Sequence, residues 1–227
     1  MRLPCQYAEL INISAPDILY LAQHFLFMTE SGFLQLKSKI LLLLRTGLDP
    51  RLTYHSPAHT EDVLRQVERI AAAENITDTR LLLLMRIAAL FHDTGFLRTY
   101  KGHEKESCLI LHETVDDCQF DDTEIKIMNG MIMATKIPQS PKSLPEMIIC
   151  DADLDYLGRN DFEVISNALK NEFITYHVIK DEEEWDRLQV SFFEGHSYFT
   201  SASLRDRYPI KMQHLEKLKQ KLLRQEL

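Results

Sequence analysis

The feature that most constrains the fold is a nearly continuous apolar run, Leu81–Phe91, that ends in the adjacent pair His92 and Asp93. As a helix the run is apolar almost all round, which predicts the buried central helix of the protein. A buried carboxylate without a partner costs several kcal/mol or loses its charge, whereas a bound divalent cation compensates the charge and uses both donors. We therefore interpret His92 and Asp93 as metal ligands at the end of this helix.

The whole chain has helical patterning. Only seven glycines, few alternating β-branched runs and repeated i, i+3, i+4 apolar spacing predict an all-α protein. With 227 residues, 45% hydrophobic and 26% charged, the chain can bury a sizeable core, and we expect one compact multi-helix domain over 1–227. Residues from about 50 to 160 carry the candidate site, 1–49 add N-terminal helices and 161–227 add C-terminal helices.

Start and stop signals give the expected helix boundaries. Ser56 and Pro57 predict a helix start, because serine caps a helix and proline lacks only an N–H that the first turn does not use. The central helix is expected from an N-cap at Thr77 or Asp78 to Gly95, a residue typical of helix C-termini. The other expected helices are 17–29, 33–44, one that begins at 103, 121–135, 145–157, 161–178, 182–193 and 203–225.

Three histidines are placed where they could face the His92–Asp93 pair. Val63 and Val67 follow His59 at i+4 and i+8, so His59 lies on the apolar face of its helix. His55 precedes the cap of that helix and could face the same cavity from the approach loop. His103 opens a later helix and lies on its partly inward face.

Three aspartates alternate in the segment 151–155. Ile149 and Asp153 share one helical face, whereas Asp151 and Asp155 share another at i, i+4. Asp153 is therefore the inward candidate, and the other two are expected to hydrogen-bond nearby backbone or to fix a ligand. The acidic run 181–184 is predicted to be a solvated helix start.

Net charge restricts the classes of molecule that the protein can bind, and cysteine usage indicates its redox compartment. A net charge of -8 and a pI of about 5.6 disfavour a broad basic surface for duplex nucleic acid, while one local pocket for a phosphate is compatible with them. Small substrates therefore fit this chain better than polynucleotides. No apolar run approaches the ~20 residues that span a bilayer, so we expect no membrane segment. A reducing cytoplasmic location with free thiols is predicted because no CxxC spacing occurs among Cys5, Cys108, Cys118 and Cys150.

Four stretches together resemble the HD superfamily of metal-dependent phosphohydrolases: Tyr54–His59, Phe91–Gly95, Gly102–Ser107 and Asp151–Gly158. A lone His-Asp doublet would be a weak signal, but four motifs in the right order are specific. The resemblance implies a helical HD-type bundle. It also implies that the metal ligands are His59, His92, Asp93 and Asp153.

The Tyr-His pair before the first motif helix is similar to the same element in cyclic-nucleotide phosphodiesterases, where that histidine protonates the leaving oxygen. This similarity implies that His55 is the general acid. His103 is a second candidate for proton transfer, and Lys136 or Lys105 could compensate phosphate charge.

The expected cofactor is a divalent metal ion. Two imidazoles and two carboxylates suit Mn, Fe, Co, Ni or Zn better than Ca, with Mg suited when phosphates complete the shell. A bound ion lowers the pKa of water and polarises a phosphoryl oxygen. The helix ending at Lys136 supplies none of the further histidines of two-metal HD proteins, so a second ion would be held weakly by Asp93, His103 and water.

The leading functional prediction is a phosphohydrolase that cleaves a phosphomonoester or phosphodiester bond of a nucleotide or similar small phosphorylated metabolite. The alternative is a regulatory domain that binds a nucleotide without turnover. Oxygenase chemistry at two irons is disfavoured by the small histidine set. The last expected helix either packs onto the body or forms a homodimer contact through one stripe, Met212, Leu215, Leu218 and Leu222.

Overall fold

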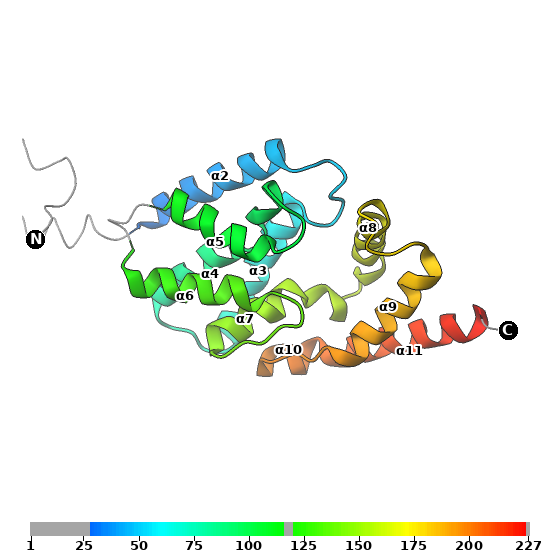
Figure 1. The fold of residues 1–227 in the computed structure, drawn as a ribbon. Coiled ribbons are helices and arrows are strands. Elements are labelled where there is room, and N and C mark those ends of the chain that lie inside the picture. The colour runs from blue at the N-terminus through cyan, green and yellow to red at the C-terminus, as the bar shows by residue number, and fades with distance from the viewer. Residues whose placement is uncertain (1–27, 116–119, 226–227) are drawn as a thin grey trace, which may run out of the picture.

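The computed structural model describes residues 28–115 and 120–225. Within these ranges every regular element is helical (Figure 1), which confirms the all-α prediction. Positions 17–27 of the helix expected over 17–29 lie outside the described residues. Its last expected residue, Thr29, is the N-cap of α2. The helices are α2 Glu30–Gly47, α3 Pro57–Ala73, α4 Thr79–Phe91, α5 His103–Thr114, α6 Asp122–Ala134, α7 Leu144–Asp153, α8 Phe162–Thr175, α9 Glu182–Gly195, α10 Ser201–Asp206 and α11 Tyr208–Gln225, with two 3-10 turns, η1 Thr94–Leu97 and η2 Asp155–Gly158.

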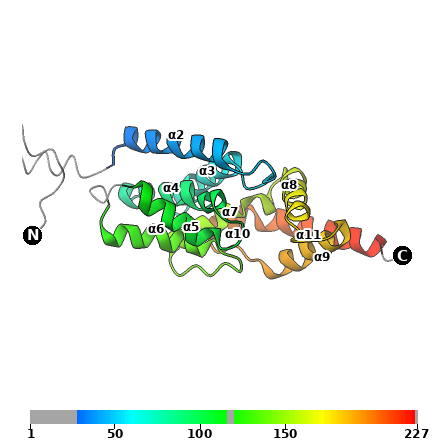
Figure 2. The same cartoon turned by 45° about the horizontal axis from the view of Figure 1, so that its top comes forward.

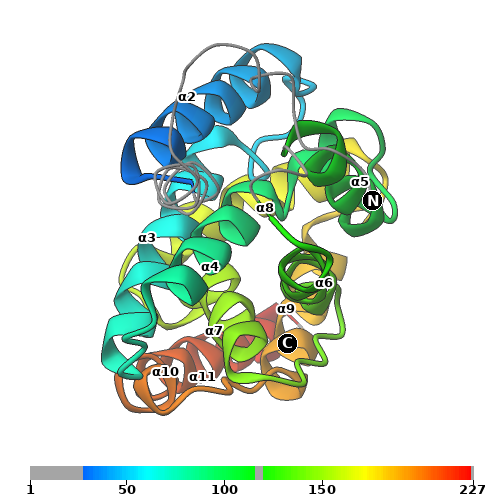
Figure 3. The same ribbon diagram turned by 90° about the vertical axis from the view of Figure 1, so that its left-hand side faces the viewer.

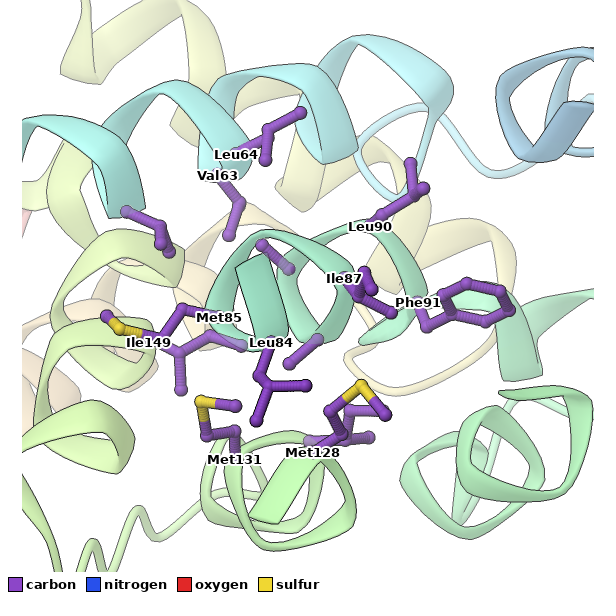
Figure 4. Packing of buried hydrophobic residues seen from close by; sticks show 14 of the residues in the cluster. Val63, Leu64, Leu84, Met85, Ile87, Leu90, Phe91, Met128, Met131 and Ile149 are labelled. Atoms are coloured by element: carbon purple, nitrogen blue, oxygen red, sulfur yellow. The ribbon is translucent and has the colours of Figure 1, made fainter. Parts of the chain in front are cut away.

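Helix α4 is the centre of the bundle, as its composition predicts. It lies between α3 and α6 (Figure 3), also contacts α5 and α7, and has α2 packed across it and α3 (Figure 2). The buried apolar side chains of α4 and its neighbours form the main hydrophobic cluster of the protein. Burying one large apolar side chain contributes about 1.5–3 kcal/mol, so this cluster is a major source of stability. Figure 4 shows part of it: Val63, Leu64, Leu84, Met85, Ile87, Leu90, Phe91, Met128, Met131 and Ile149.

The helix starts predicted at Ser56–Pro57, at Asp78 and at the acidic run 181–184 are confirmed by their caps, whereas the helix expected from 33 begins earlier, at Glu30. Ser56 accepts a hydrogen bond from the backbone N–H of His59, and Pro57 occupies the first turn of α3. Asp78 accepts from the N–H groups of the first turn of α4. The acidic run 181–184 begins α9, with Asp181 accepting from the N–H of Glu184. These caps satisfy N–H groups that the first turn of a helix leaves free.

The central helix ends earlier than predicted. It stops at Phe91, and the chain passes through His92 and Asp93 into η1. Gly95 is therefore not a helix C-terminal residue. A side chain at Gly95 would place its Cβ 1.9 Å from the carbonyl oxygen of His103, so the glycine permits the start of α5 to pack against this turn.

Two other predicted boundaries are corrected in the same way. Helix α7 ends at Asp153 rather than 157, because the chain turns into η2, where a Cβ on Gly158 would lie 2.4 Å from the carbonyl oxygen of Arg207. The single helix expected over 203–225 is two helices, α10 and α11. Pro209 lies in the first turn of α11, where its lack of an N–H is tolerated.

The C-terminal helices pack onto the body around a second apolar cluster. Helix α11 contacts α9 and η2, and α10 contacts α3. Leu215 of the predicted stripe is buried, whereas Met212 is exposed, so α11 uses part of the stripe for packing within the chain. A homodimer contact stays a prediction. The cluster consists of Tyr54, Leu154, Tyr156, Leu157, Phe162, Phe193 and Leu215.

The described helices include none long and apolar enough to cross a membrane. Cys108 and Cys150 are free thiols, as expected. Cys5 and Cys118 lie outside the described residues.

Candidate metal centre

Four predicted ligands converge where α3, α4 and α7 meet. His59 Nε2 lies 3.1 Å from Asp153 Oδ1 and 3.3 Å from Asp93 Oδ2. His92 Nε2 lies 3.1 Å from Asp93 Oδ2 and 3.6 Å from Asp153 Oδ1. The two imidazole Nε2 atoms are 3.4 Å apart. The side chains of His59, His92 and Asp93 are buried and together form a group that could hold a metal ion.

Local hydrogen bonds fix the orientation of His92 and of the segment that carries Asp93. The Nδ1–H of His92 donates to the carbonyl of Ala89 at 2.8 Å, which leaves Nε2 facing the cluster. Buried Ser107 locks the segment after α4, because its hydroxyl donates to the carbonyl of His92 at 2.7 Å and accepts from the N–H of Gly95 at 2.8 Å. Ser107 belongs to α5, the helix that begins at His103, so this helix also fixes the position of the His92–Asp93 pair.

The donor set fits a divalent transition metal. Donors that each lie about 2.1 Å from one ion are roughly 3.0–3.4 Å from one another. The separations of 3.1–3.6 Å in this cluster are close to that range. Oδ2 of Asp93 is buried yet accepts no hydrogen bond of acceptable geometry in the described part of the chain. A cation among these atoms would satisfy this oxygen.

Without a cation, protons compensate the two carboxylates. Burial would lower the pKa of His59, but the neighbouring carboxylates of Asp153 and Asp93 outweigh it and raise the pKa to about 9. Burial would raise the pKa of Asp153, but hydrogen bonds from His59 and His92 lower it to about 2. Metal ions and protons therefore compete for this cluster, and binding a metal releases protons.

His55 lies beside the cluster and is held by a residue that sequence patterns missed. Its Nδ1–H donates to Oε1 of Glu172 at 2.5 Å, and Oε2 of Glu172 accepts the backbone N–H groups of Tyr54 and His55. Glu172 is fully buried. A signal existed, since Glu172 follows Leu169 at i+3 on the inward face of α8, but no motif marks it.

His103 lies on the same side of the cluster as His55. Its Nε2 is 3.5 Å from Asp93 Oδ1 and 3.9 Å from Oε1 of the buried Glu104. The ring of Phe96 stacks on both imidazoles, with centroid distances of 4.0 Å to His55 and to His103, and the two imidazole centroids are 6.0 Å apart. This stack holds the two candidate proton donors at a fixed separation.

A cavity of about 430 Å³ connects these groups. Asp93 and Asp153 line it together with His55, His103 and the exposed side chain of Lys136. The predicted catalytic residues and the candidate metal cluster therefore share one cavity. Lys105, the weaker alternative, does not line it.

The two flanking aspartates serve the fold. Asp151 accepts from the backbone N–H groups of Phe199 and Thr200 at 2.9 and 2.8 Å, as expected of a residue that hydrogen-bonds backbone. Asp155, by contrast, pairs with the guanidinium groups of Arg69 and Arg207 at 2.6 and 2.8 Å. Neither belongs to the metal group.

Comparison of the chain with protein-family models, with characterised proteins and with solved structures gives no match.

Proposed function

We propose that this protein is a metal-dependent phosphohydrolase of the HD type, acting on a phosphomonoester or phosphodiester of a nucleotide or similar small phosphorylated metabolite. The observation that carries the proposal is the convergence of His59, His92, Asp93 and Asp153 beside a cavity that also contains His55. The order of the four sequence motifs supports it.

The chemistry of the proposed reaction divides between the ion and the protein. A divalent ion held by His59, His92, Asp93 and Asp153 would supply hydroxide at neutral pH and polarise the phosphoryl oxygen. Asp93 and Asp153 would place that ion at one end of the cavity, and Lys136 compensates part of the phosphate charge as a point cation.

His55 is the proposed general acid. Its Nδ1 is engaged by Glu172, so Nε2 is the nitrogen that can give a proton to the leaving oxygen. The buried carboxylate of Glu172 fixes the orientation of the imidazole through this hydrogen bond. His103, whose ring also stacks on Phe96, is the second group able to transfer a proton.

The test combines metal analysis with phosphate release. The purified full-length protein is analysed for bound metals, stripped, reloaded with each candidate ion and assayed on nucleotides and small phosphodiesters. We expect metal-dependent phosphate release that is lost in His92→Ala and retained in the matched control His112→Ala, an exposed histidine outside the cluster. A protein that binds metal and nucleotide but releases no phosphate from any ester would instead be a regulatory binding domain.

A further inference from the structure

The half of the cavity beyond the candidate metal centre is apolar. Side chains from η2, α8 and α9 line it, and they include Leu157, Phe162, Leu169, Phe173, Trp185 and Phe193. We refer to these six residues as the aromatic half. The cavity volume of about 430 Å³ falls within the roughly 300–1,000 Å³ of small-molecule sites.

Charge in the cavity does not suit a polyphosphate. Among the described residues that line it, Lys136 is the only lysine or arginine. Asp93, Glu104 and Asp153 line it as well. A divalent ion held by Asp93 and Asp153 would offset those two carboxylates, and Lys136 offsets Glu104, so little positive charge is left for several phosphate groups. One phosphate group at the metal end is the charge that the lining can accommodate.

Hydrogen-bonding capacity in the aromatic half is also small. Gln189 lines it, and the bond that its Nε2 donates to the hydroxyl of Ser166 already uses part of the hydrogen-bonding capacity of this amide. A polar sugar buried there would lose water contacts without gaining enough partners, which disfavours binding. An alkyl chain or an unsubstituted ring has no hydrogen bonds to water to lose, and its transfer from water into the cavity is favourable.

On the basis of the proposed phosphohydrolase function, we infer that the substrate is a phosphate ester of an apolar alcohol, whose alkyl or aryl group occupies the aromatic half. The phosphate then lies at Asp93 and Asp153, with His55 next to the leaving oxygen. Hydrolysis breaks the bond from phosphorus to that oxygen, water supplies the new oxygen on phosphorus, and the alcohol leaves with a proton.

The experiment uses monoalkyl phosphates from ethyl to decyl, with adenosine 5′-monophosphate and 5′-triphosphate for comparison. The full-length, metal-loaded protein is assayed for phosphate release, and the affinities of the matching alkylphosphonates are measured by calorimetry. We expect kcat/KM and phosphonate affinity to rise up to about fourfold per methylene until the cavity is full. Both nucleotides should react more slowly than the long alkyl esters.

Substitutions in the aromatic half give a second measurement. Leu188 and Leu169 both line the cavity, and Leu188 is 38% exposed, so Leu188→Asn is compatible with folding. Leu188→Asn and Leu169→Asn should flatten the dependence of kcat/KM and of phosphonate affinity on chain length, while metal content stays that of the wild type. The matched control is Val164→Asn on α8, because Val164 is 74% exposed and does not line the cavity.

The outcomes separate this inference from the proposed function. Hydrolysis with no dependence on chain length, or with adenosine 5′-monophosphate preferred over decyl phosphate, would overturn the inference and leave the phosphohydrolase in place. Phosphonate affinity that rises with chain length without hydrolysis of any ester would support the apolar site and overturn the phosphohydrolase.

Discussion

His55 and the buried Glu172 form a pair in which Nδ1 of the histidine lies 2.5 Å from Oε1 of the glutamate, 117 positions later in the chain. Burial would raise the pKa of Glu172, but the hydrogen bond and charge of His55 and two backbone N–H groups hold it below its ordinary value. The hydroxyl of Tyr100 also donates to Oε1, at 3.2 Å. Helix α8 thereby fixes a residue beside the candidate metal centre.

Removal of the His55 imidazole should separate metal binding from chemistry. His55→Ala is expected to keep its metal and to lower kcat by the ~10²–10⁴-fold that a positioned proton donor contributes. An ester with a nitrophenolate leaving group needs little protonation, so its loss should be much smaller. Metal content and both rates are measured on one preparation. Equal losses on the two substrates with full metal occupancy would exclude the general-acid role.

Glu172→Gln tests whether the glutamate acts through His55. The amide keeps the shape but not the charge, so kcat should fall, by less than in His55→Ala. Because both residues serve one step, the double variant should be no slower than His55→Ala alone. Rates of the wild type, the two single variants and the double variant give the coupling. Additive losses would show that Glu172 acts independently of the histidine.

His92→Ala and Asp93→Ala should abolish stoichiometric metal. The ion would link α3, α4 and α7, so the wild type should also gain stability from it, by about 2.7 kcal/mol at a metal concentration 100 times Kd. Elemental analysis and thermal unfolding with and without metal measure both effects. His112→Ala, the control outside the cluster, should bind as much metal as the wild type and gain as much thermal stability from it. Retention of stoichiometric metal by either variant would place the ion elsewhere.

Two neighbouring aspartates should respond differently to the same change. Asp153→Asn is expected to remove metal, because Asp153 lies 3.1 Å from His59. Asp155→Asn should keep metal and lower the free energy of unfolding by about 3 kcal/mol, because it breaks buried ion pairs with Arg69 and Arg207. Metal content and denaturant unfolding distinguish the two. Equal metal loss in both variants would contradict the structure of this segment.

Lys211 predicts a dependence of stability on pH. It is 1% exposed, its ammonium donates to the carbonyl of His196, and burial lowers its pKa to about 8 from 10.5. The unfolded state therefore binds more protons between these pH values, and wild-type stability rises there. Lys211→Met should be more stable than the wild type by on the order of 2–3 kcal/mol at pH 7, with a difference that shrinks up to pH 10.5. Urea unfolding of both proteins at pH 7 and pH 10 measures this difference in the free energy of unfolding. A difference that grows with pH would refute the lowered pKa of Lys211.

Helix type, most helix starts and the inward faces were predictable from sequence because they depend on neighbours a few residues apart. Ser56 and Asp78 cap their helices as expected, and the spacing of Val63 and Val67 placed His59 inward. The order of the His and Asp motifs also identified four side chains that lie together.

Only the tertiary structure decided where α4 and α7 end, which residue holds His55 and what lines the cavity beside the candidate metal centre. Gly95 and Gly158 stand where distant backbone segments approach too closely for a side chain, so their meaning depends on α5 and on the α10–α11 junction. Glu172 and the aromatic half of the cavity lie far from the motifs in sequence. Such contacts leave no local periodicity or cap signal, because they form only when the helices pack.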